Sequence, residues 1–118
     1  MAASYSGPSA ALEKYAAVVA AIGVERKGAG TPYTSLNGHM FSFLDASGAV
    51  SLRLSPDDRT EFLQRYKAKL SEQHGRIMKD FVAVPSRLLD NADELANWLV
   101  RSRDWTAALK PKPTRPKH

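Results

Sequence analysis

The spacing of apolar residues changes along this chain, and the changes predict both helices and strands. Tyr15, Val19 and Ile22 follow one another at four- and three-residue steps, which predicts an amphipathic helix over residues 10–22. Gly23 comes next, at the position where many helices end on a glycine. A helix therefore opens the folded part of the chain.

The middle of the chain changes to a two-residue period. Residues 40–44 are apolar and β-prone, and in residues 49–54 apolar side chains alternate with Ser51 and Arg53. Residues 45–48 lie between these segments and predict a tight turn. Alternation of this kind is typical of an antiparallel sheet with one buried face and one solvent-exposed (wet) face. Ser51 and Arg53 are expected on the wet face.

Two further strands are predicted around this pair. Residues 24–27 are a candidate first strand, and the Asn37-Gly38 pair predicts a turn, since both residue types tolerate positive φ. Residues 81–84 are apolar and precede Pro85, which favours an extended conformation before it. The sequence therefore predicts one strand before the central pair and one after it.

The start of a second helix is predicted at Ser55-Pro56. A serine is a good N-cap, and proline is well suited to the first helical position. Phe62, Tyr66 and Leu70 then follow at four-residue steps, so the helix is expected to continue to about Leu70.

A last helix is predicted after Asn91. Asn91 and Glu94 have the spacing of a capping box, and the apolar stripe behind them continues to about Leu109. A single helical turn is expected just before it, at residues 86–89. Lys110-Pro111 ends the regular structure, because proline lacks the backbone donor that a helix requires.

These segments together predict an α+β fold, with a curved antiparallel β-sheet, helices packed on one face and the element order α-β-β-β-α-β-α. The domain is expected over residues 9–110. Residues 1–8 are small, polar and punctuated by glycine and proline, so a flexible lead-in is expected. Residues 111–118 contain three prolines among basic residues, which favours an extended basic tail.

Length and composition narrow the classes of protein. A chain of 118 residues has the length of one domain. It has no cysteine, which excludes disulfides and thiolate metal sites and is usual in a reducing compartment. The first residues lack the features of a signal peptide, and no apolar stretch approaches the roughly 18 residues of a membrane span. We expect a cytoplasmic protein without membrane association.

The basic charge is concentrated at the C-terminal end. Of the 17 basic and 12 acidic residues, 11 of each lie in residues 1–100, and the other six basic residues and one acidic residue lie beyond them. Basic side chains outside a core favour a weak, salt-sensitive contact with an anionic partner such as nucleic acid. The candidate contacts on the second helix, the last helix and the tail are Arg65, Lys69, Arg101, Lys110, Lys112, Arg115 and Lys117.

No arrangement of polar residues in the sequence is typical of a catalytic or metal site. His39, His74 and His118 lack the close helical or strand spacing that would preorganise metal ligands. His74 is instead expected to cap the second helix. Gly28 and Gly30 lack the lysine and hydroxyl of a phosphate-binding loop. We therefore expect no enzyme activity, no catalytic residues, no metal and no cofactor.

Three marks in the sequence resemble the N-terminal domain family of the TfoX/Sxy competence regulators, which is related to the MmcQ/YjbR-like proteins. The marks are the glycine ahead of Met40-Phe41, the strand Ser51-Leu52-Arg53-Leu54 that leads into an acidic helix start, and Val84-Pro85 followed by Leu88-Leu89. The resemblance covers roughly residues 12–109.

This resemblance implies an antiparallel sheet with helices on one face, in a family whose biochemical activity is mostly unknown. Some members regulate DNA uptake genes, but this sequence shows no second helical domain after residue 110, which weighs against direct transcriptional control. The leading hypothesis is a non-enzymatic binding or adaptor domain, acting through its sheet surface, on a protein partner or as a homodimer. The alternative is a nucleic-acid-associated protein that uses the basic tail and the second helix.

Overall fold

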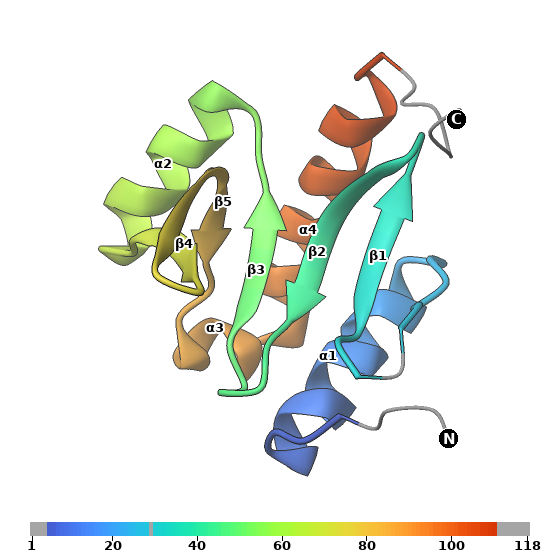
Figure 1. Ribbon diagram of the computed structural model, residues 1–118. Coiled ribbons are helices and arrows are strands. Elements are labelled where there is room, and N and C mark those ends of the chain that lie inside the picture. Colours follow the sequence, from blue (N-terminus) through green and yellow to red (C-terminus); the bar gives the residue numbers. More distant parts are fainter. Residues whose placement is uncertain (1–4, 29, 111–118) are drawn as a thin grey trace, which may run out of the picture.

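The computed structural model of the chain describes residues 5–28 and 30–110. In chain order its elements are α1 (Ser9–Ala21), β1 (Tyr33–Leu36), β2 (His39–Leu44), β3 (Val50–Arg53), α2 (Pro56–Tyr66), β4 (Leu70–Gln73), β5 (Arg76–Ala83), α3 (Ser86–Leu89) and α4 (Ala92–Ala107). The strands form one antiparallel sheet in the order β1-β2-β3-β5-β4, and the helices pack on one face of it (Figure 1). The predicted α+β class and element order are confirmed.

The helix starts follow their capping residues. The Ser55 side chain accepts a hydrogen bond from the Asp58 backbone N–H at 3.2 Å, so α2 begins with a satisfied N-terminus. The Asn91 side chain accepts from the Glu94 backbone N–H and donates to its carboxylate at 3.1 Å, which links the two residues of the predicted capping box. The predicted boundaries of α1 and α4 differ from the observed ones by one or two residues.

The main core lies between the sheet and the helices. Figure 1 views the sheet from its open side, with α1 and α4 behind β1, β2 and β3. Side chains buried between these layers include Leu44, Leu52 and Val82 from the sheet and Val19, Leu95, Trp98 and Leu99 from the helices. Each large apolar side chain buried in this way contributes about 1.5–3 kcal/mol to stability. This layer therefore dominates the stability of the domain.

Buried hydroxyl groups in this layer hydrogen-bond to one another. The Tyr15 Oη and Ser42 Oγ lie 2.7 Å apart, and Ser42 Oγ lies 2.5 Å from Thr34 Oγ1. Burial raises the pKa of Tyr15 to about 12, although the hydrogen bonds with Ser42 and Thr34 oppose this rise. The three hydroxyls satisfy each other's polar groups, so they fix α1 on the β1–β2 hairpin without an unpaired polar atom.

The second helix is shorter than predicted. It ends at Tyr66, and Lys67 takes a left-handed conformation with φ of 50°. Leu70 then begins β4 and still packs against the core, now from a strand. The four-residue step from Tyr66 to Leu70 therefore arises from two elements that face the same core, and the prediction of a helix to Leu70 was wrong.

The first strand also lies elsewhere than predicted. In residues 24–27 only Lys27 takes part in β pairing, through an isolated bridge to Tyr33. The observed strand β1 begins at Tyr33, because the turn at Asn37-Gly38 brings it back alongside β2. The Asn37-Gly38 turn is confirmed, whereas the strand at residues 24–27 was wrong.

Candidate binding site

The β4–β5 hairpin folds over the helix-free face of the sheet. Leu70 pairs with Val82, but the next residue, Ser71, pairs with Met78, so three residues of β5 are skipped at this point. Skipped residues bend a strand and increase its twist. We call residues 71–78, the bent end of this hairpin, the arm.

Two polar contacts hold the arm against strands that are not its neighbours in the sheet. Ser71 Oγ lies 2.8 Å from Ser51 Oγ on β3, although β5 separates β4 from β3 in the strand order. Gln73 Nε2 donates to Asp45 Oδ2 at 2.9 Å, at the end of β2. The arm therefore crosses the face of the sheet instead of extending beyond it. Ser51 was predicted to be wet and is buried, because Ser71 covers it.

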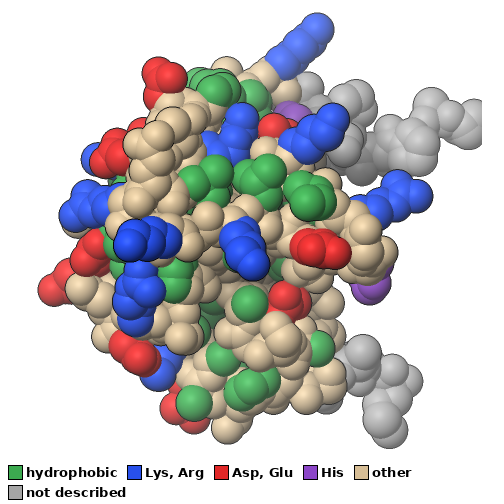
Figure 2. All heavy atoms as spheres, turned by 90° about the vertical axis from the view of Figure 1, so that its left-hand side faces the viewer, with side chains coloured by type: hydrophobic (Ala, Val, Ile, Leu, Met, Phe, Trp, Pro, Cys, Tyr) green, Lys and Arg blue, Asp and Glu red, His purple; other side chains and the backbone are tan. Residues whose placement is uncertain are grey.

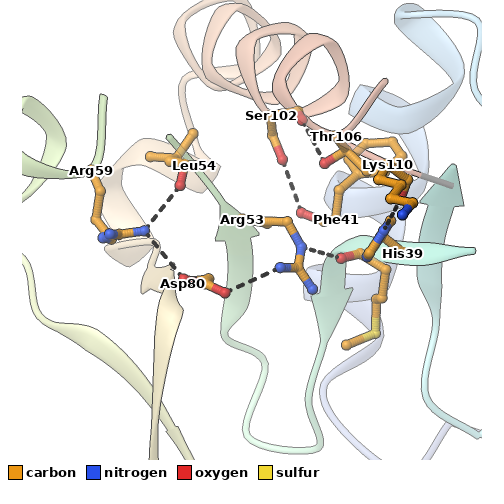
Figure 3. Close-up of polar contacts among 10 residues, drawn as sticks. His39, Phe41, Arg53, Leu54, Arg59, Asp80, Ser102, Thr106 and Lys110 are labelled. Carbon is orange, nitrogen blue, oxygen red and sulfur yellow. Dashed lines mark hydrogen bonds and ion pairs between the residues drawn. The ribbon is translucent and has the colours of Figure 1, made fainter. Parts of the chain in front are cut away.

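Aromatic side chains lie on the sheet beneath the arm. The rings of Phe43 and Phe81 have centroids 5.5 Å apart, and the two residues are only 4% and 3% exposed. The Arg53 guanidinium lies over Phe81, 4.7 Å from the ring centroid, and Arg53 Nε donates to the Met40 carbonyl at 2.9 Å. Arg53 also pairs with Asp80, which in turn pairs with Arg59 of α2 (Figure 3).

A hollow of about 380 Å³ lies between the arm and β2. Its residues come from the arm, from β2, from the turn after β2 and from the segment before β1: they are Thr31, Met40, Phe43, Asp45, Ala46, Gln73, His74 and Met78. Small-ligand sites in proteins typically occupy about 300–1,000 Å³ and combine an apolar lining with a few polar groups. This hollow meets both conditions.

Asp45 is the carboxylate of the hollow. Its Oδ1 accepts hydrogen bonds from the Ser47 N–H, the Ser47 hydroxyl and the Ala49 N–H at 2.6–3.1 Å, while Oδ2 accepts from Gln73. Partial burial raises the pKa of Asp45, but the hydrogen bonds from Ser47, Gln73 and Ala49 together outweigh it and leave the pKa below its ordinary value. The group is therefore an anion near neutral pH and a weak base.

His74 forms the tip of the arm. It takes a left-handed conformation with φ of 54°, followed by Gly75 with φ of 77°, and these two residues make the turn from β4 to β5. The prediction that His74 caps α2 was wrong, because a whole strand separates it from that helix. His39 is placed differently: its Nε2 lies 3.0 Å from the Lys110 carbonyl (Figure 3).

A second hollow of about 290 Å³ lies near the end of α1. It is lined by residues that follow α1 and by Leu36, Phe41 and Arg103. Arg103 donates to the Ile22 carbonyl at 3.2 Å and pairs with Asp104, so its charge is engaged within the chain. Glu25 and Ser35 also line this hollow, but the Glu25 carboxylate is exposed to solvent, whereas Asp45 is partly buried.

Two predicted contacts for an anionic partner belong to an ion-pair network between α2 and α4. Arg101 lies 3.4 Å from Asp58 and 3.5 Å from Glu61, and its guanidinium covers Trp98 at 4.6 Å from the ring centroid. Arg65 lies 3.9 Å from Glu61 and 3.8 Å from Glu94 of α4. Acidic partners thus offset both charges, which reduces their attraction for an external anion.

Lys69 and Lys110, the other predicted contacts in the described residues, form no ion pair with this network. Lys69 is exposed on the connection to β4, and Lys110 follows the end of α4. Lys112, Arg115 and Lys117 lie outside the described residues, as does the predicted tail at 111–118. The edge formed by α2 and the hairpin carries basic and acidic side chains side by side (Figure 2). Of the four predicted contacts that lie in the described residues, two therefore have acidic partners within the chain and two have none in the described part.

The hollow was not predicted from the sequence. Residues 45–48 were predicted as a turn, but His74 was placed at the end of a helix, and Gln73 and Met78 were given no element. The His74-Gly75 pair was the available signal for a hairpin turn, because histidine and glycine both tolerate positive φ.

No family model, curated protein or solved structure matches this chain. Across residues 5–28 and 30–110, no helix is both long enough and apolar enough to cross a membrane. The hollow under the arm is therefore the feature of this chain that bears on its function.

Proposed function

We propose that this chain is a non-enzymatic binding domain that takes up the apolar group of a partner molecule in the hollow under the arm. The observation that supports this proposal is the hollow itself, about 380 Å³ in volume and lined by Met40, Phe43 and Met78 beside Asp45. Methionine side chains adapt to ligands of different shape and make favourable contacts with aromatic rings. A regulatory domain of the TfoX N-terminal type is consistent with such a role.

The hydrogen bonding and the lowered pKa of Asp45 favour binding over catalysis. Hydrogen bonds outweigh partial burial and lower the pKa of Asp45, which makes its carboxylate a poor general base. Its Oδ1 is saturated by three donors, and Oδ2 already accepts from Gln73. A carboxylate held in this way serves recognition better than proton transfer.

The proposal is tested with indole as a neutral apolar probe. Met40 and Met78 line the hollow, so their ¹³C-methyl NMR signals are suited to report on its occupancy. We expect both methyl signals to shift and to saturate as indole is added. Absence of any shift at millimolar indole would refute the proposal.

A pair of matched variants locates the binding. Ala46 is exposed and lines the hollow, so Ala46→Trp is expected to fill it and to abolish the shifts. Ala17 is exposed on α1 on the helix side of the sheet, and Ala17→Trp adds the same side chain away from the hollow. Equal binding by Ala46→Trp and the wild type would contradict the location.

A second candidate function, nucleic-acid association, is favoured by a different observation. Four basic side chains around β4 and β5 are exposed and form no ion pair within the described part of the chain: Lys67, Lys69, Arg76 and Lys79. The exposed acidic side chains among them are Glu72 and Asp80, and Asp80 is already paired with Arg53 and Arg59. These lysines and this arginine, with the basic residues after position 109, would contact phosphates.

Fluorescence anisotropy with duplex and single-stranded DNA tests this alternative. We compare the full chain, a chain ending at Leu109, and the Lys69→Gln/Lys79→Gln variant, at low and at physiological salt. The alternative predicts binding that weakens with salt and with each loss of charge. Binding that is absent at low salt, or unchanged by both alterations, would exclude it.

A further inference from the structure

Asp45 differs from every other carboxylate in the described part of the chain. Six acidic residues form ion pairs, and the partly buried ones among these, Asp58 and Glu94, are paired with arginines. Of those without an ion pair, only Asp45 is partly buried, and the others are exposed to solvent. Asp45 thus combines partial burial with an unmatched negative charge.

The neighbours of Asp45 explain how it stays ionised without a cation. Ser47, Ala49 and Gln73 supply four neutral donors, and none of these partners in the described residues carries a positive charge. Arg53, on the same face, is committed to Asp80 and to the Met40 carbonyl. A partly buried anion with this surplus charge attracts a cation that reaches it.

The carboxylate lies beside an apolar lining, so a cation that binds it also contacts apolar side chains. Asp45 and Gln73 lie beside Met40, Phe43 and Met78 within the same hollow. Oδ2 accepts one hydrogen bond, from Gln73, and a carboxylate oxygen accepts a second. A ligand therefore meets an anionic acceptor beside an apolar wall.

We infer that the hollow binds a small organic amine, with its ammonium group on Asp45 Oδ2 and an aromatic body against Met40, Phe43 and Met78. The inference rests on the proposed function and adds the class of ligand. An aromatic body suits the two methionine sulfurs and the Phe43 ring. The volume lies near the lower limit for ligand sites, which favours a small molecule over a peptide segment.

Three indoles of similar shape and different charge test the inference. Tryptamine carries an ammonium group, tryptophol is neutral and indole-3-acetate carries a carboxylate. Their dissociation constants are measured through the Met40 and Met78 methyl signals at low ionic strength. We expect tryptamine to bind about tenfold more tightly than tryptophol, since it adds a charge-assisted hydrogen bond at a partly exposed site. Indole-3-acetate is expected to bind most weakly.

The Asp45→Asn variant removes the charge and keeps the turn. The oxygen of the introduced amide still accepts from the Ser47 and Ala49 backbone N–H groups, and Gln73 preserves its contact by turning its own amide. We expect tryptamine to lose its advantage over tryptophol in this variant. Asp104→Asn removes one exposed negative charge on α4 and is expected to leave the advantage intact.

The outcomes separate this inference from the proposed function. Equal affinities for tryptamine and tryptophol, or an advantage that survives Asp45→Asn, would overturn the amine assignment while indole binding still supports the hollow as a site. Loss of the advantage in both variants would assign it to net charge and overturn the role of Asp45. Tighter binding of a lysine-containing pentapeptide than of tryptamine would overturn the choice of a small molecule.

Discussion

Leu52 and Ser51 are neighbours on β3 and are 0% and 1% exposed, yet they face opposite sides of the sheet. Leu52 points to the helices and belongs to the main apolar cluster. Ser51 points to the arm and is covered through its hydrogen bond to Ser71. Equal burial on the two faces therefore has different physical origins.

The difference lies in what covers each face. Helices present many apolar side chains at once, so they fill the space above the sheet. The arm is a narrow hairpin held by the contacts of Ser71 and Gln73, and its Ile77 remains 59% exposed. A narrow cover leaves space beside it, and this space is the hollow. The proposed binding site thus arises from incomplete coverage of one face.

The largest expected effect comes from truncation on the helix face. Leu52→Ala is expected to destabilise the domain by about 3 kcal/mol, because it removes buried methyl groups and leaves a cavity in a close-packed layer. Urea unfolding followed by circular dichroism measures the change. A loss below about 1 kcal/mol would show that the helix face is not the tighter of the two.

The matching change on the arm face is expected to be smaller and local. Ser51→Ala leaves Ser71 without its partner, which costs about 1 kcal/mol. The arm is expected to open more often, so the amides of residues 71–78 should exchange faster while those of α4 keep their rates. Hydrogen exchange measured by NMR checks this. Equal acceleration in both regions would show that the arm is not a separate unit.

The sequence predicted the helix face well because that face follows simple periodicities. The stripes of α1 and α4 and the alternation in β3 each depend on burial against one layer. Capping at Ser55 and Asn91 is local chemistry, so it was visible without the structure. The class of fold followed from these elements.

The arm face was not predicted because its cover is not periodic. Four residues, Leu70 to Gln73, form a strand that continues the four-residue spacing of the preceding helix, which hid the helix end at Tyr66. The bend in β5 results from a register shift between strands, and a single sequence carries no direct signal for register there. The hollow depends on that bend, so it was missed as well.

The acid sensitivity of the arm is expected to depend on Asp45. Partial burial raises its folded pKa, but hydrogen bonds lower it further, to below the ordinary value near 4, so its ionised form stabilises the folded state above about pH 4. This stabilisation is lost as the pH falls through the folded pKa. Urea midpoints of the wild type and Asp45→Asn are therefore expected to differ at pH 7 and to converge as the pH falls below the ordinary aspartate pKa near 4. A constant difference across this range would show that the charge contributes nothing.

The smallest effect is expected at Asp80, which forms one ion pair under the arm and another with α2. It lies where β5 bends and pairs with Arg53 under the arm at 3.3 Å and with Arg59 of α2 at 3.6 Å (Figure 3). Its side chain is 60% exposed, and exposed pairs contribute about 0–1 kcal/mol each. Asp80→Asn is expected to lower stability by about 0.5 kcal/mol in urea unfolding, and by less at high salt. A loss comparable to that of Leu52→Ala would show that this polar link, and not the helix layer, holds the bend in place.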